Sequence, residues 1–524
     1  MKNIFKYLIA GVAGVILVTS CSKDQLETSP TTSVSGTTMT ESNDAAMIAL
    51  NGVYRSMYTS GWSTTGNTHQ CFGISAYSLC ADVMGDDCIM AAQGSGWFWY
   101  DAAYNVKSRF SSGAWRSYDL WYAFYTWIAN ANYLIAMDTD EQTTDVDRLY
   151  VLGQAYGIRA YSYFMMAQYF ARTYKGHESD PCGPIYTEPT SAGTKGQPRA
   201  TVQEVYNVIV ADIAKAVDYL GRSQNTSLEI DNSFITYPVA LGLQARVALT
   251  MEDWNLAATA AEAAINLGKH SIQPVSAASF KKNTGNFINT YSAPNVMWGA
   301  NIIADQAGIY ASLYAHMDVD AAMYAGYDRA PKKINSETYD LMGEADTRRC
   351  WWDPADENNP YQQHKFNFSD MQTYLGDYIW MRIEEMYLIA AEAECMKGNE
   401  AAAQNYLNTL VKTRDANYDC SSKTGTALGK ITSERTGSLR EAIIDQRRIE
   451  LWGEYGRLYD IRRLRQGFVR TTAQGWPNDL LLTNKPTDDP ECYMWVLTIP
   501  QAEFDGNENM DLGKDQNPTG DYAE

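Results

Sequence analysis

Three aspartates, Asp82, Asp86 and Asp87, lie close together around Gly85. Glycoside hydrolases use such carboxylates in pairs, about 5 to 10 Å apart, because one acid protonates the leaving oxygen while the other serves as nucleophile or base. The same carboxylates could also bind a structural calcium ion through their oxygens. The chain has 62 acidic residues, so some will be neighbours by chance. We therefore predict no catalytic residues here.

Motifs of other enzyme classes are missing from the sequence. There is no GxSxG nucleophile motif, no HExxH zinc motif and no Walker phosphate-binding loop. The five histidines occur singly, and the nine cysteines include no CxxC spacing typical of a metal site. We therefore predict a protein that is not an enzyme, has no metal site and needs no cofactor.

Aromatic side chains are abundant, with 36 tyrosines and 14 tryptophans, many of them outside helical patterns. Aromatic rings stack on the apolar faces of sugars, whose hydroxyls hydrogen-bond to polar side chains at the rim. In the run from Trp97 to Tyr100, an extended backbone would point Trp97 and Trp99 to one side. The alternative for each ring is that it fills the core. The predicted ligand-binding residues are Trp62, Asp82, Trp97, Trp99, Tyr100, Trp298, Tyr310 and Tyr314, and Tyr324 and Tyr327 are further candidates.

The N-terminus predicts export and lipid attachment. Residues 1–20 contain two lysines, an apolar run and two small residues, which is typical of a signal peptide. The apolar run is shorter than the roughly 20 residues that a membrane-spanning helix needs. The sequence LVTSC, which ends at Cys21, resembles the bacterial lipobox. We therefore expect acyl chains on Cys21 to hold the mature chain to a membrane; an ordinary signal peptide with an incidental cysteine is the alternative.

Composition also bounds the partners and the organisation of the chain. The formal net charge of −20 disfavours phosphate backbones, so we expect no nucleic acid partner. Residues 21–40 are rich in Ser and Thr, which predicts a flexible tether between the lipid and the body. Residues 41–524 are long enough to form one large body.

Helical periodicity dominates that body. Apolar residues recur at spacings of three and four, and successive segments are close enough to pack as helical hairpins resembling tetratricopeptide units. Two irregular, aromatic-rich stretches, about 59–114 and 271–376, predict loop lobes on this scaffold, and the second could contain short strands. The predicted helical segments are 42–58, 118–137, 147–171, 201–220, 237–250 with its extension 254–267, 377–397 and 400–416.

Recognisable motifs occur in order towards the C-terminus. Residues 382–393 read RIEEMYLIAAEA, residues 439–464 read LREAIIDQRRIELWGEYGRLYDIRRL, and residues 497–518 read LTIPQAEFDGNENMDLGKDQNP. With a lipobox in front, they resemble the SusD/RagB family of Bacteroidetes surface lipoproteins. Gln446, Tyr455 and Thr498 depart from the residues common in that family, at positions that concern packing. The charges of the second motif alternate in sign, so we expect them to form ion pairs that stabilise the fold.

The resemblance implies a mainly α, SusD-like fold and a function at the cell surface. The protein would be lipid-anchored and exposed on the outer membrane, where it would bind an oligosaccharide or polysaccharide and pass it to a TonB-dependent SusC-like transporter. A peptide-capturing member of the same family is one alternative, and a surface glycoside hydrolase is another. The aromatic residues of the loops favour a glycan.

Overall fold

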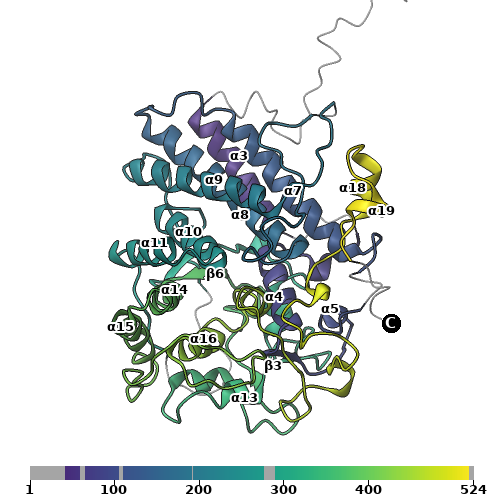
Figure 1. Cartoon of the computed structure of the whole chain (residues 1–524), viewed down its shortest axis with the longest axis vertical. Coiled ribbons are helices and arrows are strands. Elements are labelled where there is room, and N and C mark those ends of the chain that lie inside the picture. Colours follow the sequence, from purple (N-terminus) through teal and green to yellow (C-terminus); the bar gives the residue numbers. More distant parts are fainter. Residues whose placement is uncertain (1–41, 60–64, 106–109, 192, 276–289, 519–524) are drawn as a thin grey trace, which may run out of the picture.

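The structure is a computed structural model that describes residues 42–59, 65–105, 110–191, 193–275 and 290–518 (Figure 1). The predicted signal peptide, Cys21, the predicted tether and Trp62 therefore lie outside the described residues. The described part is mainly helical, which confirms the predicted fold class. None of its helices is both long and apolar enough to cross a bilayer.

Four helices form one end of the molecule, at the top of Figure 1. Helix α8 packs against both α7 and α9, and α3 packs mainly on α8. Side-chain caps define where two of them begin: Asp145 accepts a hydrogen bond from the backbone of Arg148, and Thr201 forms a capping box with Glu204. The four helices are α3 (Asn43–Ser56), α7 (Trp115–Ile135), α8 (Val146–Phe170) and α9 (Val202–Arg222).

A second group of helices continues down the left side of Figure 1. Helix α11 packs between α10 and α14, and α14 packs on α15. Small alanine side chains line the buried side of α11, which lets its neighbours approach closely. This succession of packed helices is consistent with the predicted tetratricopeptide-like scaffold. The helices are α10 (Tyr237–Met251), α11 (Trp254–Asn266), α14 (Ile383–Met396) and α15 (Glu400–Val411).

The two aromatic-rich stretches meet in space and share a small sheet. Strand β1 comes from the first stretch and pairs antiparallel with β3 of the second, in a sheet of order β1-β3-β5-β4. Strands β2 and β6 form a separate antiparallel pair. The strands are β1 (Cys88–Met90), β2 (Val296–Ala300), β3 (Lys332–Ile334), β4 (Trp352–Asp353), β5 (Gln362–Gln363) and β6 (Tyr378–Arg382). The short helices of these stretches are η2 (Thr68–Gln70), α4 (Ile74–Met84), α5 (Trp99–Ala102), η3 (Ala304–Gln306), α12 (Leu313–Met317), α13 (Ser336–Tyr339) and η4 (Thr347–Trp351).

The C-terminal segment closes the molecule around a buried charge network. Glu450, which has no exposed surface, forms ion pairs with Arg348, Arg382 and Arg414 at 2.8–3.1 Å. These arginines come from three separate parts of the chain, so the predicted stabilising ion pairs are confirmed here. The C-terminal elements are α16 (Leu439–Glu450), α17 (Arg457–Arg463), η5 (Asn478–Leu480), η6 (Tyr493–Trp495), α18 (Gln501–Gly506) and α19 (Leu512–Asp515).

Two predicted boundaries are wrong. The stretch 59–114 contains the helix α4, all of whose side chains are buried, including those of Ser75, Ser78 and Asp82; because its polar residues do not mark a solvent-facing side, amphipathic periodicity is a poor guide to this helix. The predicted helix 377–397 begins with the strand β6, because Tyr378–Arg382 pairs with β2 before the chain turns into α14 at Ile383.

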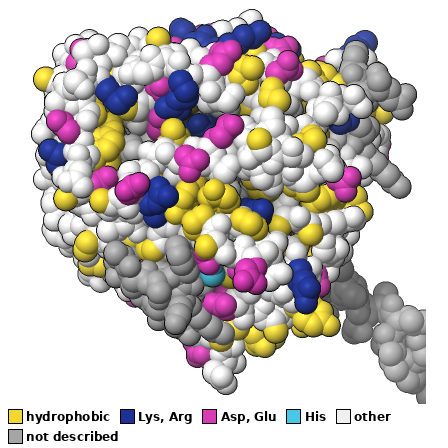
Figure 2. Space-filling model, turned by 90° about the horizontal axis from the view of Figure 1, so that it is seen from below, with side chains coloured by type: hydrophobic (Ala, Val, Ile, Leu, Met, Phe, Trp, Pro, Cys, Tyr) yellow, Lys and Arg dark blue, Asp and Glu magenta, His cyan; other side chains and the backbone are white. Residues whose placement is uncertain are grey.

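Charge is mixed on the face of the molecule shown in Figure 2. Acidic, basic and hydrophobic side chains alternate over its described part, and no continuous stripe of Lys and Arg crosses it. A stripe of that kind is what a protein needs in order to follow a phosphate backbone.

Candidate functional site

Four aromatic rings from the two stretches form one cluster, which we call the aromatic platform: His69, Trp97, Tyr310 and Tyr324. The ring centroids of His69 and Trp97 are 5.2 Å apart, and those of Trp97 and Tyr324 are 6.0 Å apart. Tyr310 stacks on His69 with an interplanar angle of 19° and also lies 5.8 Å from Tyr324. The platform therefore joins residues that are more than 200 positions apart in the sequence.

The platform is partly open to solvent. Tyr310 is 49% exposed and the neighbouring Tyr327 is 78% exposed, whereas His69, Trp97 and Tyr324 are half-buried. The Nδ1 atom of His69 hydrogen-bonds to the hydroxyl of Tyr324. Burial lowers the pKa of His69 and raises that of Tyr324, so both side chains are neutral near pH 7. The platform consequently offers uncharged rings rather than a charged site.

A buried arginine, Arg116, holds the two platform residues of the first stretch, His69 and Trp97, in place. Arg116 at the start of α7 donates to the backbone oxygen of Gln70 at 2.9 Å and to the side-chain oxygen of Gln70 at 3.1 Å. It also pairs with Asp101 of α5 at 2.7 Å. The Gln70 side chain in turn accepts a hydrogen bond from the backbone of Phe98. These contacts fix His69 and Trp97, which are the neighbours of Gln70 and Phe98 in the chain.

Tyr310 and Tyr324, which come from the second stretch, are held beside His69 and Trp97 of the first stretch by backbone pairing and one polar contact. Pairing of β1 with β3 fixes the two stretches relative to each other, and Ala91 extends it with a hydrogen bond to Pro331. Ser95 donates a hydrogen bond to the carboxylate of Asp328. His316 lies behind Tyr324, with ring centroids 4.9 Å apart, and hydrogen-bonds to the backbone oxygen of His69.

The structure brings some of the predicted ligand-binding residues together. Trp97 and Tyr310 belong to the platform, and Tyr100, three residues after Trp97 in the chain, is 42% exposed. The predicted extended run is wrong, because Phe98 adopts a left-handed conformation (φ 62°) and α5 begins at Trp99. Trp99 therefore points inward and is only 8% exposed, so Trp97 and Trp99 do not form a pair on the surface.

Three predicted ligand-binding residues are corrected to core residues. Trp298 has no exposed surface and packs against Trp380, with ring centroids 4.9 Å apart. Tyr314 and Asp82 are each 2% exposed. A side chain without accessible surface cannot stack on a ligand, so burial rules out a direct contact for all three in this conformation. Conversely, the sequence does not identify His69 as a platform residue, because a single histidine gives no signal for such a cluster.

Two of the three aspartates of the first stretch, Asp86 and Asp87, form ion pairs rather than an open acid pair, whereas Asp82 is buried and accepts a hydrogen bond from the backbone of Arg457. Arg448 contacts Asp87 at 2.7 Å, and Arg457 contacts Asp86 at 2.8 Å. Burial alone would raise the pKa of Asp86, but the charges of Arg457 and Arg448 outweigh it and lower that pKa. Carboxylates neutralised in this way are unsuited to general acid–base work. Among the described residues, no group of three or more His, Cys, Asp or Glu side chains is arranged to hold a metal ion.

Comparisons with known proteins relate the chain to the SusD family. A family model described as the SusD family matches residues 308–519, and a model described as starch-binding associating with outer membrane matches residues 66–249. The curated SusD-like protein P2 of Formosa agariphila is 24% identical over 431 residues, which are 74% of this chain and 78% of that protein.

Solved structures share the fold. A SusD-like carbohydrate binding protein from Bacteroides vulgatus superposes with a TM-score of 0.71 at 23% identity, covering 89% of this chain and 97% of that one. A SusD superfamily protein from Bacteroides thetaiotaomicron gives 0.69 at 21% identity over 91% and 100% of the two chains. Surface glycan-binding protein A from Bacteroides fluxus gives 0.62 at 17% identity over 91% and 99%.

Proposed function

Since the chain belongs to the SusD/RagB family, we propose that it binds an oligosaccharide or polysaccharide and passes it to a transporter. In this proposal the protein is held to the outer membrane by lipid on Cys21, faces the outside of the cell and delivers its ligand to a TonB-dependent SusC-like transporter. The names of its structural relatives, which include carbohydrate-binding and surface glycan-binding proteins, support a glycan as the ligand.

The observation that carries the proposal is the aromatic platform. A sugar ring stacks on a flat, uncharged aromatic face through its C–H groups, and the half-buried ring of Trp97 and the 49% exposed ring of Tyr310 provide such faces. Polar groups that could hydrogen-bond to sugar hydroxyls come from the same loops: Gln93, which donates to the hydroxyl of Tyr100, lies four residues before Trp97, and Asp328, which accepts from Ser95, lies four residues after Tyr324. Binding of this kind needs shape, stacking and hydrogen bonds, and no reacting group.

The first prediction concerns these two rings. Trp97→Ala and Tyr310→Ala should each weaken glycan binding about tenfold, because truncating an anchoring aromatic ring removes roughly 1.4 kcal/mol or more of binding free energy. The measurement is retardation of residues 22–524 in native gels that contain amylopectin, arabinoxylan or galactomannan. Trp254→Ala, which truncates a half-buried tryptophan on α11 outside the platform, is the matched control and should migrate like the wild type.

Other results of this binding experiment would favour a different binding site or one of the two alternative functions. If Trp97→Ala and Tyr310→Ala are retarded as strongly as the wild type, the platform is not the binding site. If no polysaccharide retards the wild type while a peptide mixture is retained on the immobilised protein, the peptide-capturing alternative is favoured. Release of reducing sugar during incubation with a polysaccharide would favour a hydrolase.

A further inference from the structure

A second set of aromatic side chains lines one face of helix α7, outside the platform. Tyr118, Trp121, Tyr122 and Tyr125 follow the spacing i, i+3, i+4 and i+7, which places them on one side of a helix. The rings of Tyr118 and Tyr122 stack with centroids 5.8 Å apart and an interplanar angle of 11°. Tyr122 is 41% exposed, although it belongs to a helix whose other faces are well packed. These rings extend for about 10 Å along the helix axis.

Two cavities of about 320 and 420 Å³ lie along this face of α7. They share Tyr125, Ala129, Ala502 and Glu503 as lining residues, so together they form one continuous groove. We call it the α7 groove. Its size is in the range of small-molecule binding sites. No residue that lines either cavity belongs to the aromatic platform.

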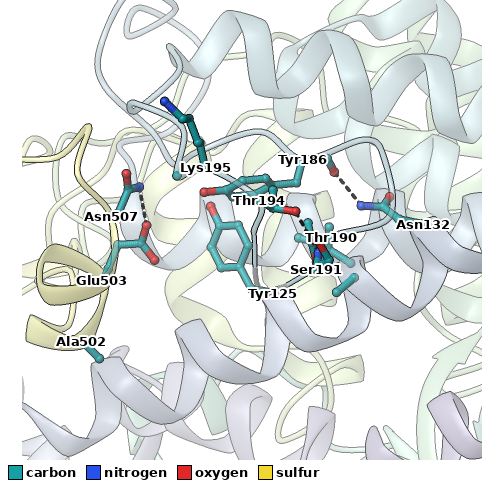
Figure 3. A pocket seen from close by; sticks show the side chains of 14 residues that line it. Tyr125, Asn132, Tyr186, Thr190, Ser191, Thr194, Lys195, Ala502, Glu503 and Asn507 are labelled. Carbon is teal, nitrogen blue, oxygen red and sulfur yellow. Dashed lines mark hydrogen bonds between the residues drawn. The ribbon is translucent and has the colours of Figure 1, made fainter. Parts of the chain in front are cut away.

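Three segments of the chain build the walls of the α7 groove. Figure 3 shows Tyr125 of α7 between Glu503 and Asn507, on the side of α18, and the loop that carries Tyr186. The loop is held to α7 because Tyr125 donates a hydrogen bond to the backbone oxygen of Pro184. Asn132 also donates, to the backbone oxygens of Tyr186 and Glu188. The groove is thus fixed by contacts within the protein.

The carboxylate of Glu503 is fixed in position and has room for further hydrogen bonds. One oxygen accepts from the indole of Trp121 at 3.0 Å, and the other accepts from Asn507 at 2.7 Å. Each carboxylate oxygen has two lone-pair directions, so Glu503 can accept from a ligand hydroxyl as well. Other hydroxyl and amide groups that line the cavities are those of Thr126, Asn130, Thr190, Ser191 and Thr194.

We propose that the α7 groove is a second binding site for a neutral oligosaccharide segment, separate from the aromatic platform. The inference rests on the proposed function for the class of ligand. Stacked tyrosines supply faces for sugar rings, and the Glu503 carboxylate with its neighbouring hydroxyl and amide groups supplies hydrogen bonds at the rim. Two separated sites on one polysaccharide chain raise the overall affinity, because binding at one site keeps the chain near the other.

Charge and side-chain type favour a neutral sugar over other ligands. The chain carries a net charge of −20, and the nearby Lys195 is paired with Glu508 at 3.7 Å, so an anionic ligand would meet little attraction. Apart from its rings, the groove is lined largely by hydroxyl, amide and carboxylate groups and by small residues. An amphipathic peptide helix would require an apolar groove for its anchor residues.

The test compares variants at the two sites in gels containing amylopectin, arabinoxylan or galactomannan. The double variant Tyr118→Ala/Tyr122→Ala should weaken retention roughly three- to tenfold, and Tyr122→Phe, which keeps the ring, should leave retention unchanged. Tyr237→Ala on α10, a half-buried tyrosine outside both sites, controls for the loss of a ring. Circular dichroism melting of each variant checks that it is folded.

A fluorescent probe placed in the α7 groove can report binding there independently of the aromatic platform. Asn130→Cys places a thiol in the α7 groove of residues 22–524, where the eight native cysteines are all buried, so a fluorophore will attach there selectively. The probe should respond to the retarding polysaccharide even when Trp97→Ala/Tyr310→Ala has disabled the platform. A silent probe, together with full retention of Tyr118→Ala/Tyr122→Ala, would overturn the α7 groove and leave the proposed function intact. Failure of all three polysaccharides to bind the wild type would overturn both.

Discussion

Asp82 is a carboxylate that the fold buries among other charges. One oxygen accepts a hydrogen bond from the backbone of Arg457 at 2.7 Å, and the side chain is 2% exposed. Burial raises its pKa to about 8. In the unfolded chain the same group titrates near 4, so folding takes up a proton between about pH 4 and pH 8. The contribution of Asp82 to the free energy of unfolding therefore falls as the pH rises through this window.

This shift predicts that Asp82→Asn stabilises the protein at neutral pH. The amide oxygen can still accept from Arg457, while the free energy of unfolding at pH 7 should rise by about 2 kcal/mol, since each pKa unit corresponds to about 1.4 kcal/mol and other charges will relax. Urea unfolding of both proteins at pH 5 and pH 8 provides the measurement. The difference between variant and wild type should grow from pH 5 to pH 8; a difference independent of pH would contradict the raised pKa.

For single residues, the sequence identified the type of side chain that forms the platform, but it did not identify which of these side chains are exposed. Trp97 and Tyr310 could be selected because aromatic residues in irregular stretches are unusual. Trp298 and Tyr314 met the same criterion, yet they fill the core. Whether such a ring is exposed depends on contacts made by residues far away in the chain, and composition carries no information about those contacts. Trp62 stays a prediction, because it lies outside the described residues.

Helices α3 and α4 approach each other at a point where only glycine fits. Gly73, with φ of +73°, precedes α4, and a Cβ atom there would lie 1.8 Å from the backbone oxygen of Met57. That oxygen follows α3 and accepts a hydrogen bond from Ile74 at 2.9 Å. Gly73 therefore joins the end of one element to the start of the next, just beyond the platform residue His69.

Gly73→Ala should consequently be among the more damaging single substitutions. We expect a loss of about 3 kcal/mol or more in the free energy of unfolding, because the clash adds to the backbone strain of a positive φ. Gly176→Ala is the matched control: its φ is +91°, but nothing lies within 4 Å of the added Cβ, so only the strain of about 1 to 2 kcal/mol remains. Equal losses for the two variants in urea unfolding would show that the close approach of the backbones does not matter.

At the scale of elements, periodicity predicted the long helices well. The segments expected at 118–137 and 147–171 correspond to α7 (Trp115–Ile135) and α8 (Val146–Phe170), because apolar residues recur at spacings of three and four in both, although α8 is buried on every side from Leu149 to Phe170. Periodicity failed for α4, which is buried all round, and for β6, whose apolar run also fits a helix. The ordered motifs 382–393, 439–464 and 497–518 carried the family prediction, and the alternating charges of the second proved to be buried ion pairs.

For the whole molecule, the proposed anchor and the proposed binding sites belong to different parts of the chain. The described body begins at Ser42, which caps α3, whereas the lipid is proposed to lie on Cys21. The predicted tether, residues 21–40, joins the two and lies outside the described residues.

Because the proposed anchor and the proposed binding sites lie in different parts of the chain, we predict that substitutions can abolish membrane anchoring and glycan binding separately. Cys21→Ser should move the protein from the membrane fraction to the supernatant and abolish labelling by radioactive palmitate, because acyl chains supply roughly 0.8 kcal/mol per buried methylene. The released protein should still be retarded by the polysaccharide that retards residues 22–524, since the platform lies within the described body. Trp97→Ala/Tyr310→Ala should show the converse, with palmitate labelling and membrane association intact and retardation reduced. Membrane association and labelling of Cys21→Ser at wild-type levels would show that another feature holds the chain to the membrane.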